Sequence, residues 1–150
     1  MRRWFLSYHS PDSALAERLA AAIEHRDRES RVFLAAKSLH AGGAWQDALA
    51  REIAQADAFI LLVGASGIGP RQVPEYNEAH DCSVKDRSFP LVLLLIEGQM
   101  APGLPFLRQL HWIITPDPTS EKDLARLIDA VSGERPRRPA SCDRRPLHIA

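Results

Sequence analysis

The sequence predicts an α/β fold, with one five-stranded parallel sheet and helices on both of its faces. Short apolar runs alternate with amphipathic segments five times along the 150 residues. Two of the apolar runs, residues 58–63 and 91–96, contain no charged residue. Such runs are typical of strands that are buried on both faces of a parallel sheet. The length suits one domain of ordinary size with its own core.

The elements follow from periodicity and from turn residues. Strands are expected at residues 4–8, 32–34, 58–63, 89–96 and 111–114, the last of them at an edge of the sheet. Helices are expected over residues 11–25, from Trp45 through Leu49 and Ile53, from Pro74 to residue 84, and around residues 124–131. Residues 35–44 are expected to form a loop, and residues 106–109 a helical turn.

Composition limits the domain organisation and the partners. We expect residues 1–133 to form the folded domain, and the Arg- and Pro-rich residues 134–150 to be a flexible tail or linker. The formal net charge is zero, so a nucleic-acid partner is not expected. No run is long enough to span a membrane, and no signal peptide is evident at the start. Cys82 and Cys142 lie far apart and the histidines do not cluster, so no metal site is expected. We therefore predict a cytoplasmic protein.

The stretch from residue 58 to residue 75 is where chemistry is expected. Its apolar strand is followed by a glycine-rich turn at residues 64–70, then by Pro74, which is expected to begin a helix, and by Glu75. In an open α/β sheet, ligands bind outside the carboxyl ends of the strands. A carboxylate just beyond a buried strand is therefore a candidate catalytic group. The alternative, that Glu75 only complements the helix dipole, stays open at this point.

Several segments together resemble a Toll/interleukin-1 receptor (TIR) domain of the bacterial type. The segments that carry the resemblance are Phe5-Leu6-Ser7-Tyr8 with Pro11-Asp12 (first box), residues 37–45 (the BB loop, closed by Trp45), residues 59–63 with Ser66 (central strand and its exit), residues 71–75 (where bacterial members carry Trp-x-x-x-Glu) and residues 89–92 (fourth strand). The resemblance covers residues 4–132 and implies a flavodoxin-like three-layer sandwich.

The resemblance also implies an activity. Many TIR domains cleave NAD+ between nicotinamide and ribose with one glutamate, which corresponds to Glu75 here, and Glu78 one turn later is the fallback. NAD+ would be a substrate, and no cofactor is expected. Further substrate-binding residues are expected at Tyr8, Ser10, Lys37, Leu39, Trp45, Ser66 and Arg71.

Three of these side chains have a second interpretation. Trp45 begins an apolar stripe with Leu49 and Ile53, which is typical of a core residue. Lys37 lies in a glycine-bearing loop and could meet a phosphate, but a solvated lysine is the commoner case. Arg71 stands where bacterial members have tryptophan, so stacking on a base or on nicotinamide is lost or changed. We therefore expect mainly linear rather than cyclic ADP-ribose.

Three functions remain open from the sequence. The first is an NAD+ glycohydrolase, a signalling or effector module of bacterial immunity that self-associates with other TIR domains through the BB loop and is fused to or partnered with a sensor domain. The second is a non-enzymatic TIR–TIR interaction module. The third is another N-glycosidic enzyme, such as a nucleoside deoxyribosyltransferase, although the BB-loop sequence argues against it.

Overall fold

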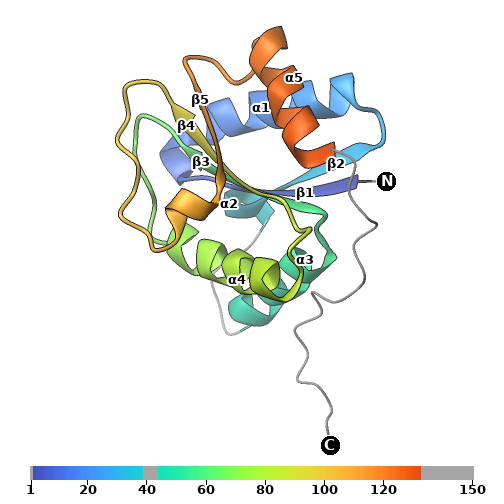
Figure 1. Ribbon diagram of the computed structural model, residues 1–150, viewed down its shortest axis with the longest axis vertical. Helices are drawn as coiled ribbons and strands as arrows, with labels where there is room; N and C mark the ends of the chain where they lie inside the picture. The colour runs from blue at the N-terminus through green and yellow to red at the C-terminus, as the bar shows by residue number, and fades with distance from the viewer. Residues whose placement is uncertain (1, 39–43, 133–150) are drawn as a thin grey trace, which may run out of the picture.

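The five strands of this protein form one parallel sheet in the order β2-β1-β3-β4-β5 (Figure 1). The computed structural model describes residues 2–38 and 44–132. The strands are β1 (Arg2–Ser7), β2 (Ser30–Leu34), β3 (Ala58–Val63), β4 (Leu91–Ile96) and β5 (His111–Thr115). Each neighbouring pair is parallel, which confirms the predicted sheet and the edge position of the last strand.

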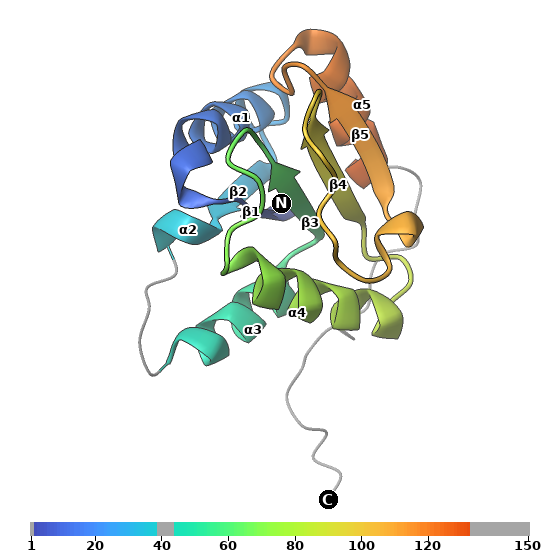
Figure 2. The same ribbon diagram turned by 90° about the vertical axis from the view of Figure 1, so that its left-hand side faces the viewer.

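Helices cover both faces of the sheet, as expected for a three-layer sandwich (Figure 2). The helical elements are η1 (Ser10–Asp12), α1 (Ser13–Arg26), α2 (Ala35–Ser38), α3 (Trp45–Gln55), α4 (Gln72–Lys85), η2 (Leu107–Gln109) and α5 (Glu121–Ser132). Helices α1 and α5 pack on one face, and α3 and α4 pack on the other. Within the described ranges, no helix is both long enough and apolar enough to cross a membrane.

Strand β3 is the centre of the core, and all of its residues are buried. Ile60 and Leu62 face α1 and α5, whereas Phe59 and Leu61 face α3 and α4. A strand that is covered on both faces has no position for a solvated charge, which explains its uncharged sequence. Phe5 of β1 extends the packing sideways, because its ring stacks on Phe59 with a centroid distance of 5.4 Å.

Two local predictions are wrong at their boundaries. The expected loop over residues 35–44 begins instead with helix α2, in which Ala35 is buried in the core. Alanine is the best helix former, and burial of Ala35 anchors this short turn. Helix α4 begins at Gln72 rather than at Pro74. Pro74 is tolerated because it still lies in the first turn, where backbone N–H groups have no partner within the helix.

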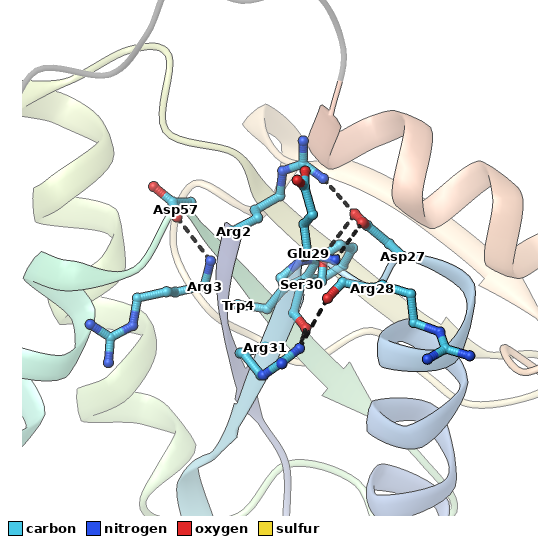
Figure 3. Close-up of polar contacts among 9 residues, drawn as sticks. All are labelled: Arg2, Arg3, Trp4, Asp27, Arg28, Glu29, Ser30, Arg31 and Asp57. Atoms are coloured by element: carbon cyan, nitrogen blue, oxygen red, sulfur yellow. Dashed lines mark hydrogen bonds and ion pairs between the residues drawn. The ribbon is translucent and has the colours of Figure 1, made fainter.

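The amino ends of β1 and β2 are joined by a buried hydroxyl (Figure 3). Ser30 Oγ accepts a hydrogen bond from Trp4 Nε1 at 3.0 Å and donates one to Asp27 Oδ2 at 2.7 Å. Arg2 forms an ion pair with the same carboxylate at 2.8 Å. The hydrogen bond from Ser30 is the largest of the effects that hold the pKa of Asp27 below its ordinary value. This contact fixes the end of the sheet that lies opposite the carboxyl ends of the strands.

Replacing Ser30 with alanine should lower the free energy of unfolding by about 1–3 kcal/mol, because the buried N–H of Trp4 loses its acceptor. Chemical denaturation at pH 7 measures the change. Ser83→Ala is the control, since its hydroxyl donates to the carbonyl of His80 within one helix, and we expect it to change stability by no more than about 0.5 kcal/mol. Equal effects of the two substitutions would contradict a special role for the Ser30 contact.

Candidate active site

A pocket lies at the point where the order of the strands reverses, between β1 and β3. From β1 the chain continues to β2 on one side and, later, to β3 on the other. Ligands of open α/β sheets bind in the crevice at such a point, outside the carboxyl ends of the strands. The pocket has a volume of about 160 Å³. It is lined by Tyr8, His9 and Ser10 after β1, by Ala36 after β2, and by residues 69–72 and Glu75 after β3.

A larger cavity of about 540 Å³ lies elsewhere, among the second half of α4, the starts of β4 and β5, and α5. It is at the amino ends of the strands, and the described residues that line it include no carboxylate. It therefore lacks the group on which the expected chemistry depends. The smaller pocket at the switch point is the better candidate for an active site.

Glu75 is the buried acid of this pocket, with 1% of its surface exposed. Ser7 Oγ donates a hydrogen bond to Glu75 Oε1 at 2.6 Å. Burial raises the pKa of Glu75 to about 7, although the Ser7 hydrogen bond and the positive charge of Arg71 act in the lowering direction. Near neutral pH this side chain therefore exists both as a carboxylate and as a carboxylic acid.

Three further residues belong to the site although the sequence pattern did not single them out: His9 and Gln72 line the pocket, and Ser7 holds Glu75. Ser7 and Gln72 are fully buried beside Glu75. His9 packs against Gly69 so closely that a Cβ at Gly69 would lie 2.5 Å from the Cδ2 atom of the imidazole. Only glycine permits this approach of the backbone to the ring. The only sequence signal for the contact between His9 and Gly69 was the glycine-rich turn at residues 64–70.

Several of the predicted substrate-binding residues line the same pocket as Glu75, namely Tyr8, Ser10 and Arg71. Burial raises the pKa of the Tyr8 hydroxyl, and the nearby charge of Glu17 acts in the same direction. Trp45 lies behind Arg71, with the guanidinium carbon 5.6 Å from its ring centroid, which is a cation–π distance. The partly buried Trp45 ring also packs against the core under α3 and α4. Trp45 does not line the pocket itself and contacts it only through Arg71.

Other predicted residues lie apart from the pocket or outside the described chain. Lys37 is exposed on α2, with its Nζ atom 3.7 Å from a carboxylate oxygen of Glu17, so the solvated interpretation suits it better. Ser66 is exposed, and its carbonyl oxygen lies 3.3 Å from His9 Nδ1. Glu78 does not line the pocket. Leu39 lies outside the described residues. In residues 2–38 and 44–132, no group of three His, Cys, Asp or Glu side chains could hold a metal ion.

Comparison with known proteins identifies the family. The sequence matches the family model of the TIR domain over residues 5–128. Among solved structures it is similar to the Clostridium botulinum CMP N-glycosidase BcmB, with 19% identity, a TM-score of 0.54 and coverage of 85% of this chain and 99% of that one. At this identity the likeness shows the fold. No curated protein matches the sequence. Because the family match spans most of the chain, this protein belongs to the TIR domain family, as its motifs predicted.

Proposed function

We propose that this TIR domain is an NAD+ glycohydrolase, in which Glu75 is the catalytic carboxylate. The observation that carries the proposal is a carboxyl group buried in a pocket at the switch point of the sheet. Two comparisons support it. The chain belongs to the TIR domain family, and this membership implies NAD+ cleavage as an activity of many members. BcmB, which shares the fold, is named as an enzyme that breaks an N-glycosidic bond.

The bond to be broken suits a site with one carboxylate. Nicotinamide carries a positive charge while it is attached to ribose and leaves as a neutral molecule, taking the bonding electrons to its ring nitrogen. No general acid is needed, in contrast to ordinary glycosidases with two carboxylates. Positive charge then develops on the ribose, and Glu75 would stabilise it. Water adds to C1′ and releases a proton, which yields nicotinamide and ADP-ribose.

Burial of Glu75 favours this transition state. Coulombic attraction between the carboxylate and the ribosyl cation is stronger where water is excluded. Burial raises the pKa of Glu75 to about 7. A cationic substrate within a few ångströms lowers the pKa of a neighbouring carboxyl, so binding of NAD+ would itself promote the ionised form that catalysis requires.

The size of the pocket limits which part of NAD+ it holds. Its volume of about 160 Å³ is below the roughly 300–1,000 Å³ of ordinary small-molecule sites. We assign the nicotinamide and its ribose to this space and the phosphates to its rim, where Arg71 can bind them through paired N–H donors. At residue 71 the pocket is bordered by an arginine side chain, where bacterial members carry tryptophan. Linear ADP-ribose is therefore the proposed product, because attack by water needs no surface on which adenine could stack.

We propose self-association as the means of activation. A neighbouring copy, contacting this one through the BB loop, would extend the small pocket around the rest of the dinucleotide. In this proposal the domain is a cytoplasmic signalling or effector module of bacterial immunity that is joined to or works with a sensor. It needs neither a cofactor nor a metal.

A non-enzymatic interaction module is the second candidate, and one observation favours it. Of the six large hydrophobic residues that are exposed in the described chain, four come from a single segment: Met100, Phe106, Trp112 and Ile114. This segment includes the edge strand β5. Phe106 and Trp112 line one open hollow of the surface, and exposed apolar side chains that lie together are typical of protein-binding sites. In this alternative, Glu75 would have only a structural role.

Glu75→Gln should reduce nicotinamide release by at least about 100-fold, because an amide cannot stabilise the positive charge on the ribose as a carboxylate does. Glu78→Gln is the matched control, one turn further along α4 and outside the pocket, and should retain activity. Chromatographic measurement of nicotinamide checks both variants. Full activity of Glu75→Gln would remove this residue from the mechanism, and loss only in Glu78→Gln would move the assignment by one turn.

The same Glu75→Gln variant should be more stable than the parent above neutral pH. The pKa of Glu75 rises from 4.5 to about 7 on folding. Over this window the folded protein holds a proton that the unfolded chain has lost, so stability falls as pH rises from about 4.5 to 7. At pH 8 the neutral amide of the variant avoids that penalty, which corresponds to about 3 kcal/mol. A variant that is both inactive and less stable at pH 8 would show loss of the fold rather than loss of the chemistry.

Gly43→Gln, in the BB loop, should lower activity and self-association together if assembly completes the pocket. Gly103→Gln is the control, because an added Cβ at Gly103 meets nothing within 4 Å. Activity per mole of protein is measured over a range of concentrations, with light scattering in parallel. Activity that is independent of concentration and unchanged by Gly43→Gln would contradict activation through this loop.

A further inference from the structure

Fully buried polar side chains gather at Glu75. Among the described residues, six polar or charged side chains are buried, and Ser7, Gln72 and Glu75 are three of them. Ser7 and Gln72 each have an exposed fraction of 0%. A buried polar group is unfavourable unless its hydrogen bonds are made, so the partners of these two residues indicate what they do.

Gln72 binds three backbone groups from different segments. Its Oε1 atom accepts a hydrogen bond from the N–H of Gly69 at 2.7 Å. Its Nε2 atom donates to the carbonyl of Leu62 at 2.9 Å and to the carbonyl of Ser7 at 3.2 Å. One carboxamide thus joins the carboxyl ends of β1 and β3 to the loop that leads into α4.

Only an amide satisfies all three groups at this position. A glutamate would place an acceptor-only carboxylate against two carbonyl oxygens, and an apolar side chain would leave one N–H and two carbonyls without a side-chain partner. Residue 72 begins helix α4, three positions before Glu75. Its contacts therefore set the position of that helix start relative to β1, the strand that carries Ser7.

We propose that Ser7 and Gln72 are positioning residues of this site: Ser7 holds Oε1 of Glu75 through its hydroxyl, and Gln72 fixes the Ser7 backbone and the Gly69 loop around the carboxyl group. Ser7 uses one lone pair of Oε1, and we assign the contact with the ribose to Oε2. This inference rests on the proposed function for its catalytic consequence, but the contact between Ser7 and Glu75 can be tested without NAD+.

The test compares the parent with Ser7→Ala, Gln72→Met and Ser30→Ala. Ser30→Ala is the matched control, because Ser30 is equally buried and also donates a hydrogen bond to a carboxylate, that of Asp27, at the other end of the sheet. Carbon-13 NMR of labelled glutamate carboxyl groups follows the titration of Glu75 in each folded protein, in the absence of NAD+. Denaturation gives the stability of each variant.

Ser7→Ala should raise the pKa of Glu75 above that of the parent by about 1–2 units, since a hydrogen bond to the charged form is lost. Ser30→Ala should lose stability and leave this pKa unchanged. In activity assays the acidic limb of the kcat profile of Ser7→Ala should move upward by the same amount. Gln72→Met should lower kcat by about tenfold or more with little change in KM, because the carboxyl group loses its fixed position.

The outcomes separate this inference from the proposed function. An unchanged pKa of Glu75 in folded Ser7→Ala would overturn the role of Ser7, and an unchanged kcat in Gln72→Met would overturn that of Gln72. A shifted pKa in a protein that does not cleave NAD+ would support the positioning role of Ser7 and contradict the NAD+ glycohydrolase. If Gln72→Met does not fold, Ser7→Ala still tests the hydrogen bond between Ser7 and Glu75.

Discussion

The burial of one carboxyl group, that of Glu75, is the constraint on which the candidate site depends. Removing a carboxylate from water is unfavourable, and the pKa of about 7 reflects that. The fold offsets the penalty with a hydrogen bond from Ser7 and with the positive charge of Arg71. The same exclusion of water would strengthen attraction to a developing ribosyl cation. In the proposed mechanism, stability disfavours a buried charge at Glu75 whereas catalysis requires one, a conflict that is common in active sites.

The sheet supplies the rigidity that such a site needs. Ser7 lies on β1 in register with Leu61 of β3, so its hydroxyl is positioned by a central strand pair rather than by a loop. Sites on strands and helices hold their geometry more accurately than sites on loops. The buried, uncharged β3 and the stacked ring of Phe5 keep this strand pair in place. Gln72 then ties the start of α4 to both strands.

The sheet, the helices on its faces and the candidate residue Glu75 could all be predicted from the sequence, because each of them leaves a local pattern. A strand buried on both faces cannot carry charge, and an acid after a glycine-rich turn stands out. Ser7 and Gln72 could not be assigned in this way. Ser7 meets Glu75 across 68 residues, and Gln72 meets the Ser7 carbonyl across 65, so no local pattern records either contact. The loop expected at Lys37 was wrong for a related reason, since burial of Ala35 against the core favours helix α2 there.

We propose that the pocket acts on the glycosidic bond of NAD+. The most direct measurement is proton NMR of the concentrated protein with NAD+ in one sample and CMP in another, because the structural neighbour BcmB is named for CMP. We expect free nicotinamide and linear ADP-ribose to appear in the first sample at a rate that rises more than proportionally with protein concentration. NAD+ that stays intact at every concentration, with or without release of cytosine from CMP, would contradict this proposal.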